Sequence, residues 1–190
     1  MASQLYPFAL FLHIVGAFGL IAAVTLEAIG LRGLRHATQA DEARLWLSIS
    51  RRLVIRLAPA SLGTILLTGL YMTAVAWGPR GWILVAFASL IVLAVVGAFG
   101  TGMRMGRLEP TLSSVQGELS DDVRSRLQDP VLLTSLRVRM AMVLGVAFLM
   151  TVKPTLIAAI LVIALAAALG WLSAQVPTRR TGHELRNEVG

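Results

Sequence analysis

Two ionisable side chains, His13 and Glu27, lie in or directly after the long uncharged stretch that opens the chain. Ionisable groups are costly inside a membrane, so each of them is a candidate for function. A neutral imidazole is a good ligand for haem or a transition metal in a dry site, which makes His13 a candidate cofactor ligand. The alternative for His13 is a structural hydrogen bond to a carbonyl of a neighbouring helix.

Glu27 follows His13 by 14 residues, which places both side chains on nearly the same helix face, about 21 Å apart along the axis. The two groups are therefore too far apart to touch. Glu27 either exchanges protons or pairs with Arg51 or Arg52, and the density of nearby arginine favours pairing. Lys153 holds an anionic headgroup or a cofactor propionate, or else it anchors a helix end at the interface.

Motifs of conventional enzymes and metal sites are absent from the sequence. The chain has no cysteine, which excludes disulfides, iron–sulfur clusters and Cys-ligated zinc. Zinc-protease, P-loop and dinucleotide-binding motifs are missing as well. His36 and His183 fall outside the apolar stretches, so one chain offers no pair of histidines for a haem within the membrane. We expect no catalytic residue and no metal site other than the candidate cofactor ligand His13.

The composition is that of an integral membrane protein. Of the 190 residues, 56% are hydrophobic and 14% charged, and the mean hydropathy is +0.76, so polar side chains cannot cover a soluble globule. The net charge of +7 comes from arginines that flank apolar stretches, a pattern that excludes a nucleic-acid partner. The expected partner is the lipid bilayer, and a second copy or another membrane protein is a candidate partner.

Uncharged windows between the charged residues predict the membrane spans, because a spanning helix needs about 20 mostly apolar residues. The fourth window is short, and its helix reaches a spanning length only if Arg137 and Arg139 extend to the interface. We expect one all-α transmembrane domain over residues 1–176 and a polar cytoplasmic tail over 177–190. The expected helices cover residues 6–31, 53–76, 81–103, 134–152 and 154–175.

Lys153-Pro154 is either a turn between two helices or a kink within one long fourth helix. The turn gives five helices, with fifteen basic residues on one side of the membrane and two on the other. The kink gives four helices and leaves Lys153 in the bilayer. A lysine at the centre of a membrane helix costs about 2.5–3.5 kcal/mol of insertion free energy. Proline also prefers the first turn of a helix. We therefore predict five helices, with the N-terminus outside and the C-terminus in the cytoplasm.

The segment 39–56 mixes apolar residues with arginines. Such a pattern is typical of an amphipathic helix that lies along the membrane interface and contacts lipid headgroups. Glycines at positions 16, 19, 97 and 100 predict close approach between helices.

Several short motifs together resemble a prokaryotic integral-membrane family of unknown function, over about residues 8–154. They are Leu12-His13-Ile14-Val15-Gly16-Ala17, Arg51-Arg52-Leu53 before Pro59, Thr68-Gly69, Gly81-Trp82 and Met150-Thr151-Val152-Lys153-Pro154. More distantly, the same order is similar to the HemJ-type protoporphyrinogen oxidases and the copper-resistance protein D family. The HemJ resemblance implies haem bound through the first-helix histidine, which is His13 here. HemJ-type proteins also place His and Lys after this Gly-Trp, where the chain has Ile83-Leu84-Val85-Ala86.

Two hypotheses of function follow from the sequence. The first is a protein of the bacterial inner membrane that is not a conventional enzyme and holds haem or a similar redox group through His13. The alternative is a cofactor-free accessory or structural subunit, or a small-solute transport protein, in which His13 and Glu27 serve packing or proton exchange.

Overall fold

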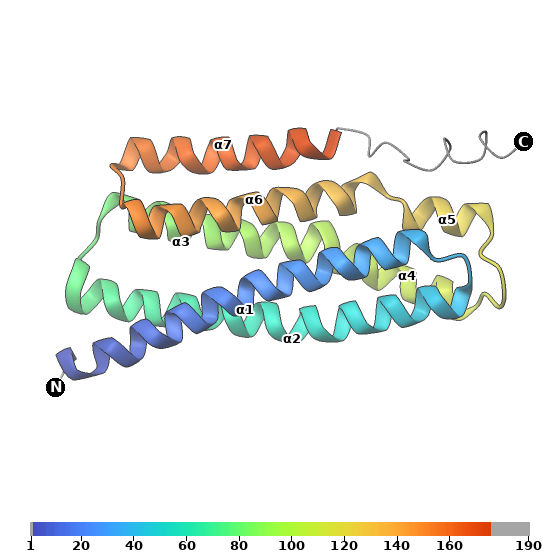
Figure 1. Ribbon diagram of the computed structural model, residues 1–190, viewed down its shortest axis with the longest axis horizontal. Helices are drawn as coiled ribbons and strands as arrows, with labels where there is room; N and C mark the ends of the chain where they lie inside the picture. The colour runs from blue at the N-terminus through green and yellow to red at the C-terminus, as the bar shows by residue number, and fades with distance from the viewer. Residues whose placement is uncertain (1, 176–190) are drawn as a thin grey trace, which may run out of the picture.

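The computed structural model describes residues 2–175, and the predicted tail 177–190 lies outside this range. The described residues are almost entirely helical, and the long helices lie side by side in one bundle (Figure 1). The segments are α1 (Ala2–His36), α2 (Ala40–Met72), η1 (Thr73–Trp77), α3 (Gly81–Val96), η2 (Gly97–Gly102), α4 (Met103–Ser113), α5 (Asp121–Leu127), α6 (Pro130–Val152) and α7 (Leu156–Gln175).

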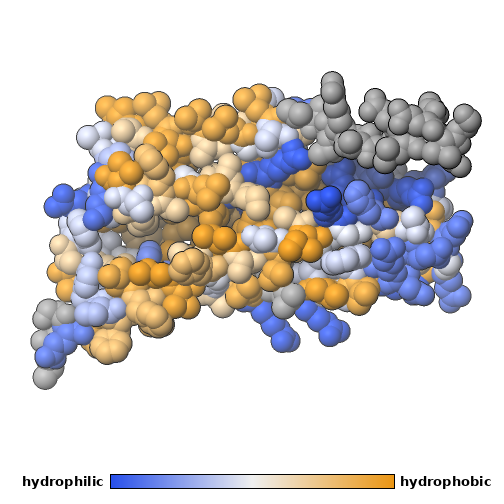
Figure 2. Space-filling model, viewed as in Figure 1, coloured by the Kyte–Doolittle hydropathy of each residue, from blue (hydrophilic) through white to orange (hydrophobic). Residues whose placement is uncertain are grey.

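Five of the described helical runs are long and apolar enough to cross a membrane, which confirms the predicted all-α transmembrane bundle. In the space-filling view, apolar side chains cover the middle of the molecule and polar ones gather chiefly at its two ends (Figure 2). Many large apolar side chains of the bundle are exposed, among them Phe18, Leu67, Leu144 and Ile157. An exposed apolar surface of this extent is suited to lipid.

The bundle has two different ends, which we name after landmarks. The Trp77 end holds the α2–α3 and α6–α7 turns, and the α5 end holds the α1–α2 turn together with α4 and α5 (Figure 1). The α5 end carries most of the arginines, whereas Arg80 and Lys153 lie at the Trp77 end.

The turn between α6 and α7 confirms the five-helix alternative and rules out one long kinked helix. Lys153 ends α6 with a left-handed backbone, φ 54° and ψ 54°, and its amide donates to the Leu149 carbonyl. Pro154 cannot continue the hydrogen-bond ladder of α6. The chain therefore reverses, and α7 packs back along α6.

The first helices are longer than predicted and extend well beyond a bilayer core. At 1.5 Å per residue, the 35 residues of α1 measure about 52 Å, against a hydrocarbon core of about 30 Å. The amphipathic segment 39–56 was expected to run along the membrane interface into the second span, which was predicted to begin at residue 53. From Ala40 onward it is part of α2, because its buried Ala43 and Leu47 pack in one core cluster with Leu31 and Leu34 of α1.

Glycines allow the closest helix contacts. A methyl group on Gly170 of α7 would lie 2.7 Å from the Cα of Val138 and 2.8 Å from the carbonyl oxygen of Arg137 on α6. These neighbours are backbone atoms, so no side-chain rotation can make room. Gly63 on α2 has no such neighbour within 4 Å.

We predict that Gly170→Ala destabilises the bundle by about 1–3 kcal/mol, because α7 must move away from α6. Gly63→Ala is the matched control, and it should leave stability unchanged or slightly higher, since alanine favours helix. Thermal unfolding of the detergent-purified variants measures both. Equal melting temperatures for the two variants would contradict the close α6–α7 contact.

Candidate functional site

His13 on α1 faces α2 and is hydrogen-bonded to it. Its Nδ1 lies 2.9 Å from the hydroxyl oxygen of Thr68. The Thr68 hydroxyl donates its proton to the Thr64 carbonyl at 2.5 Å, so its oxygen is left to accept from His13. This arrangement puts the imidazole proton on Nδ1, and the backbone of Ile65 on α2 is a second hydrogen-bond partner of the ring.

A cavity of about 350 Å³ adjoins His13 and opens toward the Trp77 end. Its size is at the lower end of the range for small-molecule sites. The wall is mostly apolar and aromatic, and it also holds two thioethers. The lining residues include Tyr6, Met72, Trp77, Trp82, Phe87, Met150 and Lys153.

Aromatic and cationic groups meet at the mouth of this cavity. The rings of Trp77 and Trp82 lie edge to face with centroids 5.9 Å apart, and the Trp77 indole N–H donates to the Tyr6 hydroxyl at 3.2 Å. The ammonium of Lys153 lies 4.1 Å from the centroid of the Trp77 ring, and Arg80 lies 5.9 Å from it. Lys153 is thus held at the mouth of the cavity, where the left-handed turn presents it.

A second site lies toward the α5 end, where Glu27 of α1 and Arg139 of α6 form a buried ion pair. Their side chains are 1% and 8% exposed. The Arg139 Nη2 group donates to Glu27 and also, at 2.8 Å, to the hydroxyl of Thr101. Opposite charges this deeply buried are tolerated only as a pair with further hydrogen bonds, which Thr101 supplies here.

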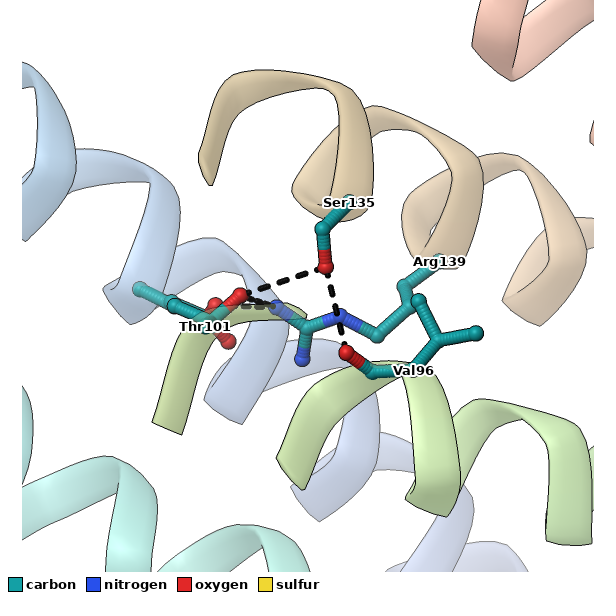
Figure 3. Close-up of polar contacts among 5 residues, drawn as sticks. Val96, Thr101, Ser135 and Arg139 are labelled. Carbon is teal, nitrogen blue, oxygen red and sulfur yellow. Dashed lines mark hydrogen bonds and ion pairs between the residues drawn. The ribbon is translucent and has the colours of Figure 1, made fainter. Parts of the chain in front are cut away.

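The π-helical turn η2 positions Thr101 beneath α6. The Thr101 hydroxyl lies 3.3 Å from that of Ser135, which donates to the Val96 carbonyl at 3.3 Å (Figure 3). A π-helical turn inside a helix often marks a functional site. Here it carries Thr101 into contact with Arg139 while α3 and α4 remain one continuous run.

Two glycines at this turn make room for the polar side chains of α6. A methyl group on Gly97 would lie 3.1 Å from Nη1 of Arg139, and one on Gly100 would lie 2.3 Å from the Ser135 hydroxyl. Close packing was predicted at these two glycines, and the groups that pack against them are polar side chains of α6.

Glu27 forms an ion pair, as predicted, but the predicted partner is wrong, because Glu27 pairs with Arg139 instead of Arg51 or Arg52. Arg51 pairs with Glu109 of α4, and Arg52 is exposed on α2. Arg139 was expected to extend to the interface, but it is buried. Arg137 instead donates to the backbone carbonyl of Ser173 on α7.

Arg139 is the functional candidate that the sequence analysis missed. The available signal was a glutamate in an apolar helix, which requires a cation, and an arginine in another apolar helix, which requires an anion. Sequence distance favoured Arg51 and Arg52, but these side chains leave the α1–α2 interface toward α4 and the surface. His13 and Lys153, in contrast, meet at one cavity.

We predict that Thr101→Val destabilises the protein by about 1.5–3 kcal/mol, because it removes a hydrogen bond to a buried charged group. Thr134→Val is the matched control, since the Thr134 hydroxyl only donates to Pro130 of its own helix. Thermal unfolding in detergent compares the two. A Thr101→Val variant as stable as Thr134→Val would show that Thr101 does not stabilise the ion pair.

Comparison of the chain with protein-family models, with curated proteins and with solved structures gives no match. We therefore base the proposed function on the geometry of the two sites.

Proposed function

We propose that this membrane protein binds haem or a similar planar redox group in the cavity beside His13. One observation carries the proposal, which is the hydrogen bond from His13 Nδ1 to Thr68. Metal-ligating histidines are commonly oriented by such a bond, which fixes the tautomer and leaves the other nitrogen free to ligate. A cavity of about 350 Å³ borders the same side chain and leaves space for such a group.

The other residues of the cavity fit the same group. Met72 and Met150 offer thioether sulfurs, and histidine with methionine is a ligand pair used for haem iron. Lys153 at the mouth is suited to an anionic propionate, and Trp82 and Phe87 offer flat apolar surface. Bound haem would supply one-electron transfer. In this proposal His13 binds the group and Lys153 orients it, with Trp77 restricting water at the mouth.

The proposal describes an electron carrier and not a conventional enzyme. The cavity wall offers a ligand, thioethers and aromatic rings, whereas a hydrolase or transferase needs a nucleophile beside a base. An electron carrier needs a partner, and another membrane protein or a second copy of the chain is the partner we propose.

We also propose that the protein resides in the bacterial cytoplasmic membrane with its N-terminus outside. The support is the asymmetry of charge, since fifteen basic residues belong to segments on one side and two to the other. Segments rich in arginine stay in the cytoplasm. The α5 end would then face the cytoplasm, and the His13 cavity would lie in the outer half of the membrane.

Single cysteines test this orientation, because the chain has none of its own. We predict that a membrane-impermeant maleimide labels Thr155→Cys in intact cells, because Thr155 is exposed at the Trp77 end. The matched variant Ser114→Cys, exposed at the α5 end, should be labelled only after lysis. The reverse pattern would invert the proposed topology.

The haem proposal is tested by the ultraviolet–visible spectrum of protein purified after expression with a haem precursor. We predict a Soret band and sharp α and β bands after reduction for the wild type, and their loss in His13→Ala. Thr68→Val should lower the haem content about 10–100-fold, because the imidazole loses its orienting partner.

The exposed His36 provides the control, and His36→Ala should keep the wild-type spectrum. Spectra without haem bands in the wild type would refute the proposal. Equal bands in the wild type and His13→Ala would show that haem binds elsewhere.

A further inference from the structure

The ion pair of Glu27 and Arg139 lies in the wall of a second cavity, of about 300 Å³. The rest of the wall is mainly apolar, with Val24, Leu62, Leu93 and Val143 among its members. Leu20, Leu93 and Val143 also line an apolar cavity that adjoins His13. The second cavity nevertheless shares no lining residue with the 350 Å³ cavity at the Trp77 end, so it is distinct from the proposed redox site.

Arg139 has hydrogen-bonding capacity that the ion pair does not use. Its Nη2 group makes the contacts to Glu27 and Thr101, whereas Nε has no partner and Nη1 makes no hydrogen bond within residues 2–175. Figure 3 shows the second terminal nitrogen of Arg139 without a dashed line, directed away from Thr101 and Ser135. A buried guanidinium donates strongly to carboxylates, and an unused donor in a dry site is costly.

The charges at this cavity determine what it can accept. The charged side chains in its wall, among the described residues, are Glu27, Arg51 and Arg139. Arg51 is already neutralised by Glu109, and Glu27 neutralises Arg139. An added anion would leave one uncompensated negative charge in a low-dielectric site, which is expensive. A cation would be repelled by two guanidinium groups, so an anion that arrives with a proton fits best.

We propose that this cavity binds a small apolar monocarboxylate, such as a short- or medium-chain fatty acid, together with one proton. The carboxylate accepts hydrogen bonds from Arg139, and its hydrocarbon chain occupies the apolar wall. The incoming proton binds the Glu27 carboxylate, which becomes neutral as the ligand replaces it beside Arg139. The net charge of the cavity is zero before and after binding, because one negative charge and one proton enter together.

The walls also provide a route for such a ligand. The cavity is bounded by Ile55, Ala58 and Pro59 of α2 and by Ala94 and Ala98 of the α3–η2 run. Helices α2 and α3 touch each other little along their length, and Ile55, Pro59 and Ala98 are exposed. A carboxylic acid dissolved in the membrane can therefore reach Arg139 between these two helices.

Isothermal titration calorimetry of the full chain in nanodiscs tests the proposal, with octanoate as the probe and octan-1-ol as its uncharged analogue. Titrations at pH 7 in buffers of different ionisation enthalpy count the protons bound per octanoate, after subtraction of protein-free nanodiscs. We expect saturable octanoate binding with uptake of about one proton, and at least tenfold weaker binding of octanol, which cannot use the charge of Arg139.

Variants distinguish the proposed binding of octanoate at Arg139 from simple partition of octanoic acid into the cavity. Arg139→Gln should weaken octanoate binding at least tenfold, whereas Arg137→Gln is the control and should bind as the wild type does. Glu27→Gln resembles the protonated carboxyl, so it should bind octanoate with no proton uptake. An octanoic acid molecule that entered in its neutral form would still take up a proton in Glu27→Gln.

Three results would overturn the proposal. Octanol binding as tightly as octanoate would mean an apolar cavity without anion recognition. Proton uptake that persists in Glu27→Gln would remove Glu27 from the mechanism. Equal octanoate affinities of the wild type and a folded Arg139→Gln variant, checked by its unfolding transition, would remove Arg139. None of these results bears on the His13 cavity, whose test is spectroscopic.

Discussion

The buried ion pair between Glu27 and Arg139 is the constraint on which the rest of the structure depends. Removing one partner of such a pair costs about 3–5 kcal/mol, because the other charge is left unpaired. The pair joins α1 to α6 and, through Thr101, to the π-helical turn η2. It therefore fixes the rotation of three helices about their axes, which apolar packing alone would specify only loosely.

The membrane-spanning helices could be predicted from the sequence, because the length of an apolar stretch and the charges that flank it can be read from neighbouring residues. The Lys153-Pro154 turn was predictable for the same reason, since a buried lysine and an interior proline are both costly. The partner of Glu27 was harder to predict than the spans, because apolar windows define spans but not which helices are neighbours. Nor did the sequence show that the segment 39–56 continues directly into the second span, since Arg51 and Arg44 contact Glu109 and backbone carbonyls from later in the chain.

The two cavities divide the bundle into halves with different chemistry. At the Trp77 end, the His13 imidazole lies beside thioethers and aromatic rings, a set suited to a redox group. At the α5 end, Arg139 has unused donors beside the carboxylate of Glu27, in a mainly apolar wall. The first cavity is the proposed site of the haem group that the sequence suggested as one hypothesis. The second cavity bears on the alternative hypothesis of small-solute transport, for which we propose a monocarboxylate as the solute. Both remain proposals that rest on separate residues.

The most direct test of this account is a double-mutant cycle at Glu27 and Arg139, measured by unfolding in detergent. We expect Glu27→Gln and Arg139→Gln each to destabilise the protein strongly. The double variant should lose less than the sum of the two, because neither charge is then left unpaired, with an interaction energy of about 1–3 kcal/mol. Strictly additive effects of the two substitutions would contradict the claim that this pair organises the bundle.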